Sequence, residues 1–122
     1  MLSIIIPLRD EFDNLEKVRD KFNEKLSDIN HEVLLINDFS KDNTLDRAKE
    51  ISKNNKNFKV FENDKKGLGG ALNLGIEKSA GDYICIMMAD LSDDIDDLKR
   101  YNELIEQGYN PNRLRVRTLL NE

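Results

Sequence analysis

Residues 2–7 read LSIIIP and residues 32–37 read EVLLIN, and these two short apolar runs decide the fold. Each run is followed by a segment in which apolar residues recur at helical spacing. This alternation is typical of β–α units stacked around a parallel sheet. Further runs at residues 58–62 and 82–88 complete a set of four predicted strands. The sequence therefore predicts an α/β fold with a mainly parallel sheet.

Four helices are expected to follow the four strands. The apolar positions expected to face the sheet are Leu15, Val18, Phe22 and Leu26 in the first helix, Leu45, Ala48 and Ile51 in the second, Leu72 and Ile76 in the third, and Ile95, Leu98, Leu104 and Ile105 in the fourth. Residues 66–70 should open the third helix. Gly81 is expected to end that helix in the left-handed conformation.

The composition fits one globular domain. The chain has 122 residues, 39% of them apolar, and a mean hydropathy of −0.63, which suffices for a single core. No run approaches the roughly 20 apolar residues of a membrane-spanning helix. No secretory leader is visible before the first strand, so a cytoplasmic location is expected.

The charge pattern limits the partners and the kind of metal site. A net charge of −5 argues against a general nucleic-acid binder, which needs clustered Lys and Arg. Cys85 is alone and cannot form an internal disulfide, and we expect it to be buried in a strand. His31, the only histidine, is expected at the surface. Any metal must therefore be held by oxygen ligands.

Polar residues follow three of the predicted strands. Asp10 and Glu11 come after the first strand, Asp38 and Ser40 after the second, and Asp90 after the fourth. Open parallel sheets bind ligands outside the carboxyl ends of their strands. We therefore expect these residues, although remote in sequence, to converge at one edge of the sheet, with Asp38 and Asp90 side by side.

Residues 4–15, IIIPLRDEFDNL, resemble the opening motif of family 2 glycosyltransferases, in which a strand ends in Pro, a hydrophobic residue, Tyr, Asn and Glu. The resemblance places Pro7, Leu8, Arg9 and Glu11 in a pocket for the base and ribose of a nucleotide sugar. Arg9 stands where the family pattern has Tyr, and a guanidinium plane can also stack on a base. A strand end followed by an acidic helix N-terminus is the alternative interpretation.

Residues 33–44, VLLINDFSKDNT, are similar to the second motif of that family, a strand that runs into Asp-Asp-Gly-Ser. The resemblance implies that Asp38 contacts the nucleobase. Phe39 and Asn43 depart from the pattern and suggest a turn that depends less on glycine, with Asn43 tolerating left-handed geometry. A helix N-cap by Asp42 or Ser40 is expected as well.

Residues 66–76, KGLGGALNLGI, resemble the family stretch Lys-Gly-x-Gly-x-Ala-x-Asn-x-Gly. Glycines at a helix N-terminus allow close backbone approach, and the free N–H groups there suit an anion. The resemblance assigns Lys66 and Gly67 to the nucleotide-sugar site. A tight turn alone would explain an isolated glycine loop.

Residues 80–92, AGDYICIMMADLS, resemble the family strand that leads to an Asp-x-Asp pair holding a divalent cation and the sugar diphosphate. The resemblance places Met88, Ala89 and Asp90 in the site and makes Asp90 the direct ligand of Mg²⁺ or Mn²⁺, with Asp93 or Asp94 assisting. Met88 replaces the first carboxylate of the pair. For Asp96 and Asp97 we favour a simpler role at a helix N-terminus.

Together the four motifs imply a Rossmann-like, three-layer GT-A fold that is truncated. Residues 1–107 would form its nucleotide-sugar-binding half, and residues 108–122, with three arginines, an unmatched basic tail. The residues around Asp90 lean towards enzymes similar to dolichyl-phosphate mannose synthase, which implies a polyprenyl-phosphate acceptor at a membrane surface and a location peripheral to the membrane. The half that supplies the acceptor base is not recognised, so no catalytic base is named and self-association through an exposed edge is expected.

Two alternatives remain open at this point. A catalytically incomplete module could bind a nucleotide sugar without turning it over. A nucleotidyltransferase-like or response-regulator-like domain also places acids at strand ends, but the ordered Asp and Lys of a response regulator are missing from the sequence.

Overall fold

The computed structural model describes residues 1–91, 95–108 and 116–118 as helices, strands and defined loops. The elements alternate in the order β1 (Leu2–Leu8), α1 (Phe12–Lys25), β2 (His31–Asn37), α2 (Thr44–Asn54), β3 (Phe58–Glu62), α3 (Leu68–Lys78), β4 (Tyr83–Ile86), α4 (Ile95–Glu106) and β5 (Val116–Thr118). The four strands predicted from the sequence are all present. The fourth is shorter than predicted, and a hydrogen bond from Met87 N to Ile5 O at 3.0 Å continues its contact with β1 beyond Ile86.

The sheet has the strand order β3-β2-β1-β4-β5, and every neighbouring pair is parallel. The prediction of a mainly parallel sheet is therefore confirmed. β1 lies at the centre, and all seven of its residues are buried, as expected for a strand covered on both faces. β5 lies within residues 108–122, the tail for which no sequence motif was recognised, and it adds a fifth strand to the sheet.

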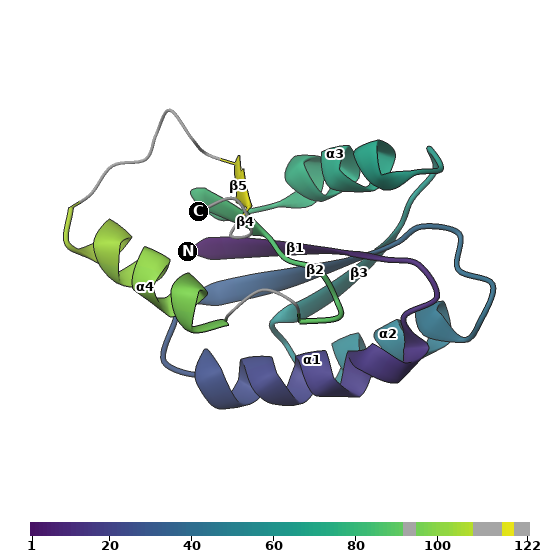
Figure 1. Ribbon diagram of the computed structural model, residues 1–122, viewed down its shortest axis with the longest axis horizontal. Coiled ribbons are helices and arrows are strands. Elements are labelled where there is room, and N and C mark those ends of the chain that lie inside the picture. Colours follow the sequence, from purple (N-terminus) through teal and green to yellow (C-terminus); the bar gives the residue numbers. More distant parts are fainter. Residues whose placement is uncertain (92–94, 109–115, 119–122) are drawn as a thin grey trace.

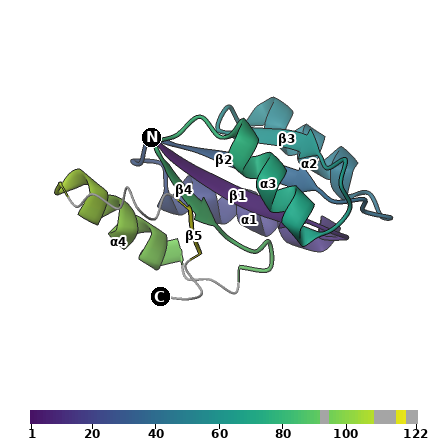
Figure 2. The ribbon, with the colours of Figure 1, turned by 90° about the horizontal axis from the view of Figure 1, so that it is seen from above.

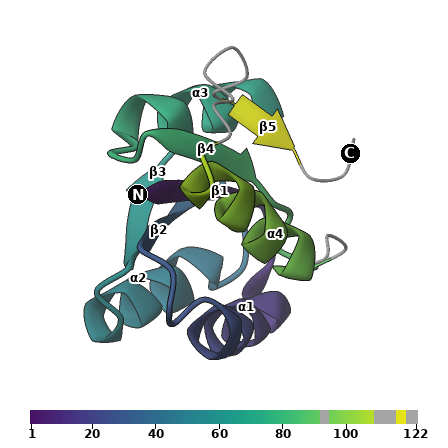
Figure 3. The ribbon, with the colours of Figure 1, turned by 90° about the vertical axis from the view of Figure 1, so that its left-hand side faces the viewer.

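Helices cover both faces of the sheet, so the molecule has three layers (Figures 1 and 3). Helices α1 and α2 lie below the sheet in Figure 1, α3 lies above it, and α4 packs beside α1. Figure 2 shows α3 crossing over β1 and β2. The larger core is formed on the α1, α2 and α4 side, and the smaller core on the α3 side is built around Ile5, Leu34 and Ile36.

Most apolar positions face the core as their spacing predicts. Leu15, Val18, Phe22 and Leu26 are all buried. Leu104 is an exception, since its side chain is 43% exposed while the neighbouring Ile105 packs on the core. His31 was expected at the surface, but it is the first residue of β2 and only 6% exposed, with its Nδ1 2.7 Å from Ile29 O. Cys85 is buried in β4 as expected.

Gly81 does not cap α3, contrary to the prediction. The helix ends at Lys78, and Ser79 closes it by donating from its Oγ to Ile76 O at 2.7 Å. Gly81 is instead the point where the chain passes close to β1: a Cβ at this position would lie 2.5 Å from Met1 O and 2.6 Å from Ser3 Oγ. Glycine is required here by close approach and not by backbone conformation.

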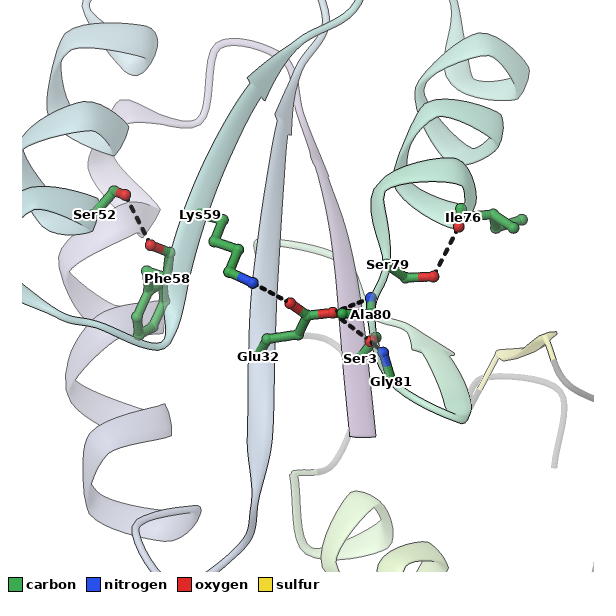
Figure 4. A network of polar contacts seen from close by, with 9 residues as sticks. All are labelled: Ser3, Glu32, Ser52, Phe58, Lys59, Ile76, Ser79, Ala80 and Gly81. Atoms are coloured by element: carbon green, nitrogen blue, oxygen red, sulfur yellow. Dashed lines mark hydrogen bonds and ion pairs between the residues drawn. The ribbon is translucent and has the colours of Figure 1, made fainter. Parts of the chain in front are cut away.

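A buried carboxylate joins the strands at the amino edge of the sheet, which is the side where the parallel strands begin (Figure 4). Glu32, at the start of β2, accepts hydrogen bonds from Ser3 Oγ at 2.6 Å and Ala80 N at 2.6 Å, and it pairs with Lys59 Nζ at 2.7 Å. Ser3 Oγ in turn accepts from Gly81 N at 2.8 Å. One side chain therefore links the beginnings of β1, β2 and β3 with the segment that enters β4.

Candidate functional site at the carboxyl edge of the sheet

Three non-glycine residues with left-handed backbone conformation mark the opposite, carboxyl edge. They are Asp10, Phe39 and Leu91, with φ angles of 54°, 56° and 57°. They follow β1, β2 and β4 respectively, and in the described part of the chain no other non-glycine residue has positive φ. Such conformations are unfavourable for L-residues and are concentrated at functional sites, because the surrounding structure must hold them.

The turn after β2 corrects one expectation. Phe39 and Asn43 were expected to make this turn less dependent on glycine, with Asn43 accepting left-handed geometry. Instead Asn43 has a φ of −85° and Phe39 takes the left-handed conformation. The turn geometry that suits glycine is therefore retained, and the chain adopts it with a bulky aromatic residue.

Asp10 joins the loops after β1 and β2. Its Oδ1 accepts hydrogen bonds from Lys41 N at 2.7 Å and Asp42 N at 3.3 Å, and its own N–H donates to Ser40 Oγ at 3.0 Å. Ser40 therefore braces the β1 loop and does not cap α2. Asp42 is not the N-cap either, because Asn43 holds that position and makes no side-chain cap hydrogen bond. Asp42 lies one residue earlier, and its Oδ1 accepts from Thr44 N at 2.9 Å.

Asp38 holds the start of α3 against the end of β2. Its carboxylate accepts from Gly67 N, at 3.0 Å and 3.2 Å to the two oxygens, and from Asn63 Nδ2 at 3.0 Å. Gly67 has a φ of 117°, which favours glycine at this helix N-cap. Although Asp38 is buried, each of its two carboxylate oxygens thus accepts at least one hydrogen bond.

The pKa of Asp38 lies below its usual range. Burial alone would raise it, but the hydrogen bonds from Gly67 and Asn63 and the positive charges of Arg9 and Lys66 outweigh burial. Two of the residues predicted for the site, Arg9 and Lys66, thus contribute positive potential at Asp38.

Asn63 was missed by the sequence reasoning. It is buried at the end of β3, and its Nδ2 lies 3.0 Å from Asp38 Oδ1, 2.7 Å from Lys65 O and 3.3 Å from Gly67 O. Its Oδ1 accepts from Lys65 N at 3.2 Å. The signal was available, because Asn63 follows β3 as Asp38 follows β2.

A pocket of about 470 Å³ opens beside this network. Its lining comes from the ends of β2 and β3, the loop after β2 and the first turn of α2: Asn37, Phe39, Ser40, Asp42, Leu45, Asp46, Glu62 and Asn63. The pocket therefore has an aromatic side chain, Phe39, and an aliphatic one, Leu45, together with several hydrogen-bond acceptors in its lining.

The other predicted site residues differ in accessibility. Arg9, Lys66 and Asp90 are exposed, Glu11, Gly67 and Met88 are half-buried, and Pro7, Leu8, Asp38 and Ala89 are buried. Pro7 and Leu8 are the last residues of β1, and Leu8 O accepts from Asp38 N at 2.8 Å. Glu11 is the N-cap residue of α1, and its backbone N–H donates to Thr44 Oγ1 at 2.9 Å.

Asp38 and Asp90 leave the sheet at the same edge. Asp38 follows β2 and Asp90 lies beyond β4, and β1 runs between these two strands. Within the described residues, no group of three or more His, Cys, Asp or Glu side chains is arranged to hold a metal. Asp93 and Asp94 lie outside the described residues, while Asp96 and Asp97 occupy the first turn of α4 as expected.

Residues 3–112 match the family described as Glycosyl transferase family 2, which is most of the chain. The chain belongs to this family. It is 30% identical over 107 residues to a dolichol-phosphate mannosyltransferase from Pyrococcus furiosus, an alignment that covers 88% of this chain and 30% of the relative. The chain therefore spans about a third of the length of that relative. The match favours the family 2 interpretation over the nucleotidyltransferase and response-regulator alternatives.

Solved structures share the fold. The mannosyltransferase PcManGT from Pyrobaculum calidifontis, in complex with GDP-Man and Mn²⁺, superposes with a TM-score of 0.65 at 22% identity, covering 73% of this chain and 27% of that one. Residues 1–349 of S. aureus TarS, in complex with UDP-GlcNAc, give a TM-score of 0.64 at 23% identity, covering 87% and 31%. These likenesses confirm the α/β architecture of GT-A glycosyltransferases.

Proposed function

We propose that this family 2 chain binds the nucleotide-diphosphate sugar of a glycosyl transfer reaction at the carboxyl edge of its sheet. The observation that carries the proposal is the carboxylate of Asp38, which is buried at the end of β2 and bonded to Gly67 N at the start of α3. This bond fixes the N-terminus of a glycine-rich helix beside the loops that follow β1 and β2. A helix N-terminus with free N–H groups favours a phosphate.

The site residues divide into three groups in this proposal. The loop after β1, with Pro7, Leu8, Arg9 and Glu11, and the Asp38 network receive the base and ribose. Lys66 and Gly67 face the diphosphate, which Lys66 attracts by its charge. Met88, Ala89 and Asp90 form the turn beyond β4 that receives the sugar-phosphate end, with Asp90 as the metal ligand.

A divalent cation fits this arrangement only with the help of the substrate. Asp90 is exposed, and Mg²⁺ commonly binds through one or two carboxylates together with substrate phosphates. The proposed Mg²⁺ or Mn²⁺ would neutralise the negative charge that grows on the diphosphate as the sugar leaves. Mn²⁺ in the complex of the Pyrobaculum transferase supports this choice of ion.

Calorimetric titration of the chain with UDP-, GDP- and ADP-sugars, with and without Mn²⁺ or Mg²⁺, tests the proposal. We expect Asp90→Ala to abolish the metal-dependent part of the affinity and to leave the fold intact, because an exposed ligand contributes little to folding. Asp38→Ala should weaken binding even without metal. Asp28→Ala, an exposed acid between α1 and β2 at the far edge, is the matched control. If both site variants bound like the parent, the assigned roles would be wrong.

The acceptor side is proposed on the name of the Pyrococcus relative, a dolichol-phosphate mannosyltransferase. We propose transfer to a polyprenyl phosphate, with this chain supplying the donor site. We name no catalytic base for the acceptor within residues 1–107. The alternative is a catalytically incomplete module that binds a nucleotide sugar without turning it over. A transfer assay with polyprenyl phosphate distinguishes them: repeated acceptor glycosylation by the 122-residue chain would exclude the module.

A further inference from the structure

Phe39 presents an exposed aromatic ring at the candidate site. It is 38% exposed, and the other aromatic residues in the described part of the chain are buried or half-buried. Phe12, the first aromatic residue after β1, is already engaged, since Arg47 lies 4.8 Å above its ring. A bulky side chain is disfavoured at a φ of 56°, so the turn holds this ring in place against a backbone preference.

The pocket that Phe39 lines suits a base better than a phosphate. Asp42, Asp46 and Glu62 lie on its wall, and their negative charges repel a diphosphate. The same carboxylates can accept hydrogen bonds from the N–H groups of a heterocyclic base. Asn37 also lines the pocket, and its Oδ1 is buried without a hydrogen-bond partner among the described residues. A buried acceptor without a partner is unfavourable, and a ligand donor would satisfy it.

The pocket continues directly into the Asp38 network. Asn63 lines the pocket and also donates to Asp38 at 3.0 Å, and Asp38 accepts from Gly67 N. A nucleotide can therefore lie with its base in the pocket and its phosphates towards Lys66 and the start of α3. Aromatic side chains bind bases by stacking, which tolerates different bases because each has a π-face.

We propose that Phe39 is a base-binding residue whose ring stacks on the base of the bound nucleotide in the pocket between β2, β3 and α2. The proposal rests on the proposed nucleotide-sugar function and adds to it the place and the wall of the base subsite. It predicts that the ring acts on the base alone and has no part in binding the diphosphate.

The test compares nucleoside diphosphates with pyrophosphate, which lacks a base, on the parent and on Phe39 variants. By calorimetry we expect Phe39→Leu to weaken nucleoside diphosphate binding about tenfold and Phe39→Tyr to retain it, with pyrophosphate binding unchanged in both. Phe39→Gly should lose the same affinity but melt at a higher temperature, because glycine relieves the left-handed strain. Thermal unfolding of each variant confirms that it is folded.

Phe39→Trp supplies a direct reporter, because the chain contains no other tryptophan. We expect its emission to be quenched by a nucleoside diphosphate and to stay unchanged with pyrophosphate. Equal nucleotide affinity of the parent and Phe39→Leu, or equal losses for nucleotide and pyrophosphate, would overturn this inference and leave the proposed function standing. A parent chain that binds no nucleoside diphosphate at all would overturn the proposed function itself.

Discussion

Met88 is the residue at which this chain departs most consequentially from its family pattern. It is half-buried beyond β4, and its carbonyl accepts from Leu91 N at 3.1 Å, which closes the turn that carries Asp90. A methionine offers no hard oxygen ligand to Mg²⁺ or Mn²⁺. The metal site proposed above therefore contains one carboxylate where the family motif has two.

Met88→Asp should tighten divalent-metal binding in the presence of a nucleoside diphosphate. A second carboxylate near the ion contributes on the order of 1 kcal/mol, or about fivefold in the dissociation constant, reduced by repulsion from Asp90. Mn²⁺ titration followed by electron paramagnetic resonance measures the change. Met88→Asn, which matches the size without the charge, should give no comparable gain. Unchanged affinity in Met88→Asp would show that this branch holds its ion with a different set of ligands.

At the scale of an element, α3 shows how small residues set the distance between helix and sheet. A Cβ on Gly75 would lie 2.5 Å from Ile5 Cγ2, in the centre of the smaller core. Gly69, in the first turn of the same helix, has no atom within 4 Å of the corresponding position apart from the adjacent residues and backbone of its own helix. The helix can therefore accept an added methyl group at Gly69 but not at Gly75.

Gly75→Ala should destabilise the protein by about 1–3 kcal/mol, because the extra methyl must push α3 away from β1 or force Ile5 out of its rotamer. Gly69→Ala is the matched control and should stabilise by about 0.5–1 kcal/mol, since alanine is the better helix former. Urea unfolding measures both. Because Gly67 is the N-cap residue of α3, a displacement of the helix in Gly75→Ala should also weaken nucleotide binding. Equal stability changes in the two variants would contradict this account of the helix–sheet contact.

The elements were predictable from the sequence because their signal is local. The apolar runs around Ile5 and Leu34 and the helical spacing of Leu15, Val18 and Phe22 each lie within one segment, and all are buried as predicted. The convergence of loops at the carboxyl edge follows from parallel pairing alone. The roles of individual site residues stay predictions, as does the domain division at residue 107.

The errors arose where the deciding contact comes from a distant segment. Gly81 is required by Met1 and Ser3, residues about eighty positions away, and not by the end of the preceding helix α3. Asn63 matters because it meets Asp38 from the neighbouring strand. The left-handed φ of Phe39 belongs to a turn whose geometry the residue type disfavours. None of these contacts leaves a periodic signal in one sequence.

At the scale of the whole molecule, two buried carboxylates hold opposite edges of the sheet. Asp38 fixes the carboxyl edge and Glu32 the amino edge, where it binds Ser3, Lys59 and Ala80. Burial acts to raise the pKa of Glu32, but the hydrogen bonds from Lys59, Ser3 and Ala80 bring it below its usual range.

No helix among the described residues is both long enough and apolar enough to span a membrane.

These lowered pKa values make the folded state sensitive to acid. A carboxyl group whose pKa is lower in the folded than in the unfolded chain binds fewer protons when folded. Its contribution to stability is therefore complete above the unfolded pKa, about 4.3 for Glu and 3.9 for Asp. It is lost as the pH falls through the folded pKa. Below that range the amino edge loses its ionic contact between Glu32 and Lys59.

Glu32→Gln should remove most of the loss of stability in acid that arises from protonation at the amino edge. At pH 7 we expect it to lower the free energy of unfolding by about 1–3 kcal/mol, because a charge-assisted bond to Lys59 is lost and a buried amide replaces the carboxylate. Between about pH 5 and pH 3 the difference from the parent should shrink, since the parent loses the same charge. Urea unfolding at stepped pH measures both quantities. Glu24→Gln, an exposed residue of α1, is the control and should change neither. A difference between Glu32→Gln and the parent that stayed constant across this range would mean that Glu32 does not act through its ionised form.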